Sequence, residues 1–268
     1  MSNQIRVSVV IPCYNHGQYI EEAIASVEQY PDKSVYEIII VNDGSTDAQT
    51  IETLKKLEEK GYFVLNQENT GLADARNNGV KLAKGDYILP LDSDNMIRPD
   101  YIKYGIEIMD KNPKVGMVYG DAQLFGTRNG IRKAGKYNRR RQFVWNAIDA
   151  CAVIRKAALD EIGGYDRNMP FMGYEDWNFV VSLDFSDWEI RYVKEVLYDY
   201  RVSDESMLTD ADEKRTSLLN YMNSNNIESF RKEYIELIKE SDAAEEFRKS
   251  VRPLILQLFK NIFKKLGF

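Results

Sequence analysis

The sequence predicts an α/β protein, a Rossmann-like three-layer sandwich with a mostly parallel central sheet, followed by a C-terminal helical extension. Two patterns carry this prediction. Short apolar runs alternate with segments of helical spacing, and such alternation gives a parallel sheet with helices on both faces. After residue 210 the chain is highly charged and helical in pattern. We therefore expect one domain over residues 1–210 and a helical extension over residues 211–268.

Each predicted strand is a short apolar run that ends at a proline, a glycine or a polar loop. The predicted strands cover residues 6–12, 36–41, 62–65, 87–91, 114–119, 150–155 and 189–193. The segments between them have apolar residues at helical spacing, and Thr46 or Asp47 is a candidate N-cap for the second helix, which runs to about Lys60. The other predicted helices cover residues 18–28, 72–83, 99–112 and 156–162, with a further one that begins at Glu175.

Polar residues follow three of the predicted strands, at the end of the sheet where α/β proteins bind ligands. Tyr14 and Asn15 follow the first strand, Asp43 the second, and Asp92-Ser93-Asp94 the fourth. Because the carboxyl ends of parallel strands lie at one edge of the sheet, these clusters should open onto a common site.

Asp92 and Asp94 are candidate metal ligands. Alternate residues of an extended chain share a face, so the two carboxylates can point at one object. They repel each other unless a cation joins them, and a divalent cation that bridges to a phosphate suits such a pair. A solvated acidic turn is the plainer alternative. An EF-hand loop is excluded, because its sixth and twelfth positions would be Ile97 and Lys103 rather than glycine and glutamate.

Composition argues against several other classes of protein. The formal net charge of −6 argues against nonspecific binding of nucleic acid. A single histidine, His16, excludes a multi-histidine zinc site, and the spacing of Cys13 and Cys151 indicates reduced thiols. Neither a dinucleotide-binding glycine motif nor a P-loop is present. Since we find no membrane-spanning run and no signal pattern, we expect a cytoplasmic location.

Charged residues in two predicted helices are further candidates. Arg76 could be a cationic partner for phosphate, although a solvent-facing arginine would explain it equally well. Glu175 and Asp176 begin a helix, where acids are favoured by the helix dipole alone. An acid beside Tyr174 and Trp177 could also have a shifted pKa and act as a base.

Two segments are rich in basic residues. Residues 126–141 are either a mobile surface loop or a lid that faces a diphosphate. The last residues, 247–268, contain no acid, and their apolar residues after Pro253 recur at helical spacing. Such a helix lies on an anionic membrane surface or packs against protein. We expect the extension to mediate homo-oligomerisation, with peripheral contact at the inner face of the cell membrane as the alternative.

Five motifs, in this order and spacing, resemble those of the inverting, metal-dependent glycosyltransferases of family 2, which have the GT-A fold. They cover roughly residues 5–205 and read Val9-Val-Ile-Pro-Cys-Tyr-Asn15, Ile40-Val-Asn-Asp-Gly-Ser-Thr-Asp47, Gly71 to Asn77, Leu91-Asp-Ser-Asp94 and Gly173-Tyr-Glu-Asp-Trp177. The resemblance implies that residues 1–210 are a catalytic domain that moves a hexose from a UDP-sugar to a hydroxyl of a growing glycan, a glycoprotein or a lipid-linked acceptor. It also implies Mn²⁺ or Mg²⁺ as cofactor.

The resemblance implies a role for each matching residue. The residues expected at the donor are Pro12, Tyr14, Asn15, Asp43, Arg76, Asp92 and Ser93, with Asp43 accepting a hydrogen bond from the uracil imide. Those expected at the metal are Asp94 and Asp92, the expected general base is Asp176, and those expected at the acceptor are Tyr174, Glu175 and Trp177. One position departs from the pattern: Ser203 stands where many relatives have a histidine near the metal, which leaves the third ligand open.

Transfer with inversion needs one base and a stabilised diphosphate leaving group. A glycoside hydrolase, which needs a paired acid and base, is therefore less favoured. Two other classes remain as alternatives. A nucleotidyltransferase would usually show a glycine-rich phosphate loop, which is missing here. A non-catalytic nucleotide-sugar-binding subunit of a glycosylation complex need not retain Asp92, Asp94 and Asp176, all of which are present.

Overall fold

The computed structural model describes residues 4–203 and 207–265, and the chain divides into two compact units, Met1–Leu219 and Asn220–Phe268. The strands are β1 Val7–Cys13, β2 Tyr36–Asp43, β3 Phe63–Gln67, β4 Tyr87–Pro90, β5 Met96–Ile97, β6 Val115–Gly126, β7 Gly130–Arg132, β8 Val153–Arg155 and β9 Glu189–Val202. The helices are α1 Ile20–Glu28, α2 Ala48–Glu59, α3 Leu72–Leu82, α4 Asp100–Lys111, α5 Arg139–Val144, α6 Lys156–Ile162, α7 Glu175–Asp184, α8 Met207–Glu213, α9 Arg215–Asn225 and α10 Ile227–Lys265.

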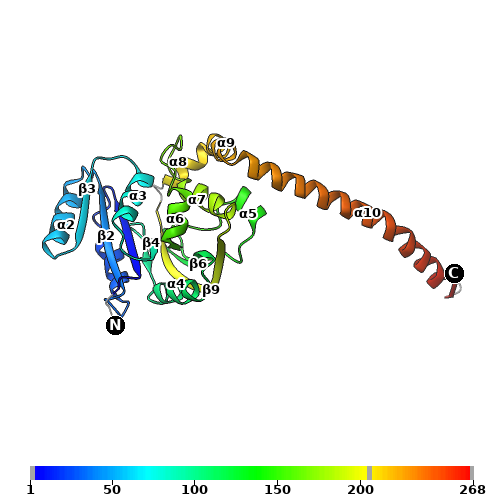
Figure 1. Ribbon diagram of the computed structural model, residues 1–268, viewed down its shortest axis with the longest axis horizontal. Coiled ribbons are helices and arrows are strands. Elements are labelled where there is room, and N and C mark those ends of the chain that lie inside the picture. The colour runs from blue at the N-terminus through cyan, green and yellow to red at the C-terminus, as the bar shows by residue number, and fades with distance from the viewer. Residues whose placement is uncertain (1–3, 204–206, 266–268) are drawn as a thin grey trace. The chain divides into compact units, whose positions relative to one another are not determined.

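The first unit is built on one sheet with strand order β3-β2-β1-β4-β8-β6-β9-β5, to which β7 is added by pairing with β6 (Figure 1). Residues of α1, α2 and α4 contribute to the hydrophobic core on one face of the sheet, and residues of α3, α6 and α7 to the core on the other. This arrangement confirms the predicted α/β class and its three layers.

The parallel half of the sheet is centred on β1, which pairs in parallel with β2 on one side and β4 on the other. Its side chains alternate between the two cores: Val9 and Ile11 lie in one, and Val10 in the other. On the Val10 side α3 approaches the sheet closely at Gly79, where a Cβ would lie 2.3 Å from Val10 Cγ1. Only glycine permits this approach without a shift of the helix.

The other half of the sheet is mixed and less regular than the sequence predicts. The short strand β8 runs antiparallel to both of its neighbours, β4 and β6. β6 and β9 continue well beyond the predicted ends at residues 119 and 193, and they pair in parallel along their whole length with three register shifts. The extra residues of β6 contain two glycines, an aspartate and a glutamine, so their strand conformation comes from pairing with β9 rather than from propensity.

The basic stretch 126–141 is folded rather than a simple surface loop. It contains β7, which pairs antiparallel with β6, and the first residues of α5. Asn138 caps α5 by accepting a hydrogen bond from the Arg141 N–H at 2.9 Å.

The second unit consists of the end of α9 and the long helix α10. Several large apolar side chains of α10 are exposed, including Tyr234, Ile235 and Phe247, the last at 68%. The predicted apolar stripe after Pro253 involves side chains that lie outside those the structure describes. Among the described residues, no helix combines the length and apolar character that a membrane span requires.

Candidate active site

The Asp-x-Asp motif lies in a turn directly after β4. The Asn95 N–H donates to the Asp92 carbonyl at 3.0 Å, which bends the chain after Leu91. The extended geometry expected for Asp92 and Asp94 is therefore wrong, and the turn rather than strand alternation brings the two acids together. Removal from water and the charge of Asp92 raise the pKa of Asp94 to about 7. Ser93, expected at the donor, is buried at 4% exposure.

Arg201, near the end of β9, holds this acidic turn in place. The Arg201 backbone N–H donates to Asn95 Oδ1 at 2.8 Å, and Arg201 Nε donates to the Asp94 carbonyl at 3.0 Å. The Arg201 guanidinium also lies over the rings of Tyr19 and Phe125, at 4.2 and 4.5 Å from their centroids. Sequence reasoning assigned no role to Arg201, yet its position supports the backbone of the candidate metal site.

Arg76 is a buried link between two carboxylates, with only 2% of its side chain exposed. One guanidinium nitrogen donates to Asp92 Oδ1 and the other to Glu175 Oε1, both at 2.7 Å. The expectation that Arg76 meets the donor directly is not favoured by this position. The structure instead uses Arg76 to join the acidic turn after β4 to the first residue of α7.

The loops after β1 and β2 are fastened together by Asn15, whose backbone is left-handed with φ of 55°. Its Oδ1 accepts from the Thr46 and Asp47 N–H groups at 2.8 and 2.9 Å, and its own N–H donates to Ser45 Oγ at 3.1 Å. Asn15 therefore shapes this loop pair. Tyr14 beside it is 46% exposed, so its ring is available to stack on a nucleobase.

Asp43 at the end of β2 is 4% exposed and already accepts three hydrogen bonds. Gln67 Nε2 and the Thr70 N–H donate to Oδ1, and the Gly71 N–H donates to Oδ2, at 2.8 to 3.0 Å. Asp43 thus fixes the loop that leads into α3. A uracil imide would have to use the remaining lone pair on Oδ2. Pro12, one strand away, is buried within β1 opposite Val41.

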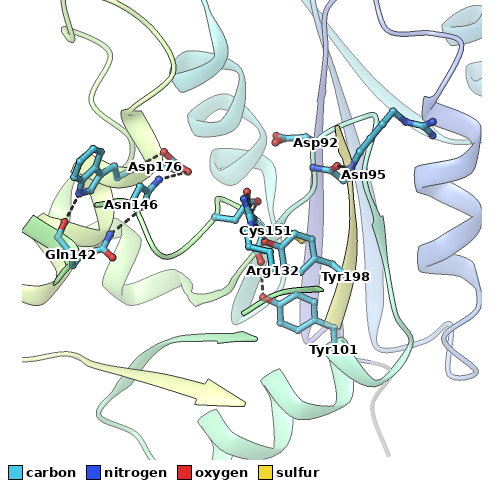
Figure 2. Close-up of polar contacts among 12 residues, drawn as sticks. Asp92, Asn95, Tyr101, Arg132, Gln142, Asn146, Cys151, Asp176 and Tyr198 are labelled. Carbon is cyan, nitrogen blue, oxygen red and sulfur yellow. Dashed lines mark hydrogen bonds and ion pairs between the residues drawn. The ribbon is translucent and has the colours of Figure 1, made fainter. Parts of the chain in front are cut away.

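Asp176 lies in the first turn of α7 and is held by two donors. Its Oδ1 accepts the Trp177 N–H at 2.6 Å, and its Oδ2 accepts Asn146 Nδ2 at 3.2 Å (Figure 2). Burial, followed by the charges of Glu175 and Asp149, raises the pKa of Asp176 to about 8. A carboxyl group with this pKa is suited to accept a proton near neutral pH.

The residues expected at the acceptor are buried rather than on the surface. Tyr174 and Trp177 are each 1% exposed and Glu175 is 2% exposed. Tyr174 donates a hydrogen bond to Asp212, and Trp177 Nε1 donates to the Gln142 carbonyl at 2.5 Å. Burial of all three does not favour direct contact with an acceptor, and we assign them to support of α7.

Sequence reasoning missed Asp149, which lies shortly before β8. Its Oδ2 accepts from Arg132 Nη2 at 2.8 Å, and its Oδ1 accepts the Cys151 N–H at 3.1 Å. Arg132 also lies over the Tyr200 ring at 4.5 Å. Asp149 raises the pKa of Asp94 and that of Asp176. No motif marks it, because its charged partner, Arg132, comes from β7 at 17 positions away in the chain.

The site as a whole has an excess of negative charge. Its five carboxylates are Asp92, Asp94, Asp149, Glu175 and Asp176, and the arginines that act on them are Arg76, Arg132 and Arg201. Arg201 also forms an ion pair with Glu22, so the acids outnumber the arginines when all are ionised. Asp92 is paired with Arg76. Within residues 4–203 and 207–265 no side chain forms an ion pair with Asp94.

A divalent cation fits this chemistry at Asp94. Burial and the charge of Asp92 raise the pKa of Asp94, and the charge of Arg201 offsets this rise only in part, so a cation would favour the ionised form. Across the described part of the chain no three His, Cys, Asp or Glu side chains are grouped to hold a metal ion. Asp94 would therefore supply a carboxylate ligand, and the remaining oxygen ligands would come from a diphosphate or water.

Two solved structures that share this architecture are TarS and the mannosyltransferase PcManGT. TarS from S. aureus in complex with UDP-GlcNAc superposes with a TM-score of 0.65 at 21% identity, covering 77% of this chain and 61% of that chain. Mannosyltransferase PcManGT from Pyrobaculum calidifontis in complex with GDP-Man and Mn²⁺ gives 0.61 at 19% identity, covering 84% and 65%. The fold is accordingly GT-A, as predicted.

The family follows from the sequence match. Residues 8–163 match the model of "Glycosyl transferase family 2", and the chain belongs to this family. Poly-beta-1,6-N-acetyl-D-glucosamine synthase from Staphylococcus epidermidis is 33% identical over 205 residues, which are 69% of this chain and 47% of that protein. The same-named protein of Staphylococcus aureus strain COL is 32% identical over 182 residues, 61% and 42% respectively. The chain thus spans about half the length of these relatives.

Proposed function

We propose that the first unit catalyses transfer of a sugar, with inversion, from a UDP-sugar to an acceptor hydroxyl. The observation that carries the proposal is the Arg76 link, which places the acidic turn after β4 and the acid-bearing start of α7 at one site. We further propose UDP-GlcNAc as donor, because TarS is in complex with UDP-GlcNAc and the related synthases are named for a polymer of N-acetylglucosamine. The acceptor in this proposal is a growing glycan, free or linked to protein or lipid.

Three residues of the chain have separate roles in the proposed transfer reaction. The Asp94 carboxylate would hold Mn²⁺ or Mg²⁺, which when bound would supply positive charge for the departing UDP. Asp176 accepts the proton of the acceptor hydroxyl as its oxygen attacks the anomeric carbon. The bond from that carbon to the diphosphate breaks on the opposite side, so the configuration inverts. Tyr14 is exposed enough to stack on the uracil.

Release of UDP tests this function. We expect the protein to release UDP from UDP-GlcNAc, with or without an added glycan acceptor, faster than from UDP-Glc, UDP-Gal or GDP-Man. Added EDTA should stop the release and Mn²⁺ should restore it. No UDP release from any of these donors, in the presence of Mn²⁺, would contradict a catalytic role.

A non-catalytic nucleotide-sugar-binding subunit is the second candidate. Ser203 at the histidine position and the lack of a three-ligand cluster in the described residues favour it. The two candidates differ in one measurement. A binding subunit is stabilised against heat by UDP-GlcNAc, as any ligand of the native state would stabilise it, but releases no UDP.

We propose that the second unit mediates homo-oligomerisation, with contact to anionic membrane lipid as the alternative. The exposed apolar side chains of α10 support it, since Tyr234, Ile235 and Ile238 are each at least 43% exposed. The proposed location is cytoplasmic, with the membrane surface as the place where a lipid-linked acceptor would be met.

A further inference from the structure

A chain of side-chain amides ends at Asp176. The Ala147 N–H donates to Gln142 Oε1 at 3.3 Å, Gln142 Nε2 donates to Asn146 Oδ1 at 3.2 Å, and Asn146 Nδ2 donates to Asp176 Oδ2 at 3.2 Å (Figure 2). Gln142 is 1% exposed and is also fixed through its carbonyl, which accepts Trp177 Nε1. Helix α5 and the loop that follows it are thereby connected to the first turn of α7.

The orientation of the Gln142 and Asn146 side-chain amides is fixed by the groups at either end of this series of hydrogen bonds. A backbone N–H, at Ala147, can only donate, so Gln142 must present its oxygen there and its nitrogen to Asn146. Asn146 must then present its nitrogen to Asp176. Reversing the amides would place Gln142 Nε2 against the Ala147 N–H, two donors with no acceptor between them.

A fixed donor therefore faces each oxygen of Asp176. Asn146 Nδ2 faces Oδ2, and the Trp177 N–H faces Oδ1. Hydrogen bonds donated to a carboxylate favour its ionised form. Each oxygen keeps a second lone pair for another partner. The groups that act against ionisation are burial and the charges of Glu175 and Asp149, while Arg76 acts in its favour.

We infer that Asn146 and Gln142 are positioning residues for the general base: they hold the Asp176 carboxylate in one orientation and favour its ionised form in a site whose burial and neighbouring acids oppose it. The inference rests on the proposed role of Asp176 as the base. Both residues act on the reaction only through Asp176. Neither belongs to the five sequence motifs that resemble those of the family. Both act through the polarity of the amide chain.

Asn146→Ala tests the last link of the chain. We expect the pKa of Asp176, followed by NMR of its ¹³C-labelled carboxyl and assigned with Asp176→Asn, to rise by about one unit. The low-pH limb of kcat for UDP release from UDP-GlcNAc should move upward by about the same amount, with a kcat loss of about tenfold below the pKa. The KM for UDP-GlcNAc should stay within about twofold, because donor binding does not use the base.

Gln142→Glu tests the polarity. One glutamate oxygen still accepts the Ala147 N–H, but the other faces Asn146 Oδ1 and turns that amide, so that an oxygen meets Asp176. We expect a larger rise of the pKa of Asp176 than in Asn146→Ala. Gln142→Met, which is similar in size and makes no side-chain hydrogen bond, should raise the pKa of Asp176 by less than Asn146→Ala, because Asn146 is still present to donate to it. Asn112→Ala, whose amide contacts only the Ile108 carbonyl, is the remote control and should leave both readouts unchanged.

The outcomes separate this inference from the proposed function. If folded Asn146→Ala keeps the wild-type pKa of Asp176 and the wild-type pH profile, the positioning role is wrong even though the enzyme turns over. If wild type releases no UDP, the catalytic proposal fails, while the NMR titration still decides whether Asn146 controls the ionisation of Asp176. If Gln142→Glu does not fold, Asn146→Ala and Gln142→Met carry the decision.

Discussion

Arg76 Nη1 and Glu175 Oε1 are 2.7 Å apart, although the two residues are separated by 99 positions in the chain. Both side chains are almost fully buried, at 2% and 3% exposure. A buried charge that loses its partner is costly, whereas an exposed one is not. The pair therefore offers a direct measure of how strongly the two halves of the site are held together.

Arg76→Met should lower the free energy of unfolding by about 3–5 kcal/mol, because Glu175 then remains buried without a counter-charge. Urea unfolding followed by circular dichroism measures the change. Arg6→Met is a matched control: Arg6 also binds two carboxylates, Asp86 and Asp110, but at a more exposed site, and its loss should cost no more than about 1 kcal/mol. Equal losses for the two variants would show that the buried link is not special.

Asp94→Asn should reduce Mn²⁺-dependent UDP release by at least about 100-fold, because it removes the carboxylate of the acidic turn that forms no ion pair within the described residues. The fold should persist. The pKa of Asp94 is raised in the folded state to about 7, so its contribution to stability is complete below about pH 4 and is lost as the pH rises toward 7. The metal-free variant should therefore melt a few degrees higher than wild type at pH 8. Near-normal activity with Mn²⁺ would remove Asp94 from the metal site.

Asp176→Asn should lower kcat by about 10²–10⁴-fold while leaving the KM for donor close to that of wild type, the usual effect of removing a general base. Isothermal titration with UDP and Mn²⁺ checks the binding. Glu175→Gln is the neighbouring control, and we expect it to act on stability through Arg76 more than on turnover. A variant at position 176 that turns over normally but no longer binds UDP would reverse the assigned roles.

Asp176 should also set the pH dependence of kcat. Since the pKa of Asp176 is about 8, kcat should rise about tenfold per pH unit below that value and level off above it. The folded-state pKa lies above the unfolded one, so the contribution of Asp176 to stability is present below about pH 4 and lost as the pH rises through about 8. Asp176→Asn should flatten this stability profile. A kcat that is constant from pH 6 to 9 would be inconsistent with Asp176 as the base.

Truncation after Leu219 should convert an oligomer into a monomer without loss of turnover per chain. The cut falls at the end of the first compact unit and keeps Asp212 and Arg215, which hydrogen bond to Tyr174. A cut at residue 210 would remove both contacts and is the comparison. Light scattering gives the mass. A full-length protein that is monomeric and binds anionic vesicles would favour the membrane alternative.

Much of the parallel half of the sheet is readable from sequence, because β-branched runs such as Val7–Cys13 and loops rich in Gly, Asn and Asp leave little choice of conformation. The same holds for Asp47 as the cap of α2, whose carboxylate accepts the Thr50 N–H. In both cases the residues that interact are near neighbours in the chain or carry a strong local preference.

The rest of the site could not be predicted, because it depends on pairings that leave no local pattern. Arg132 ends the short strand β7 and Asp149 lies in the loop before β8, and nothing in the sequence indicates that they meet. Asn146 reaches Asp176 across 30 positions through one amide. The burial of Arg76 was equally hidden, since a helix arginine is usually exposed and only the folded chain shows carboxylates on two sides of it.

The geometry of Asn15 limits how this chain can diverge. Its left-handed backbone is readily adopted by glycine, asparagine and aspartate, and glycine lacks the oxygen that accepts the Thr46 and Asp47 N–H groups. Only asparagine and aspartate meet both demands. Random substitution at this position should therefore leave only asparagine and aspartate among the functional variants. Sequence change in this loop is then confined to the positions around residue 15.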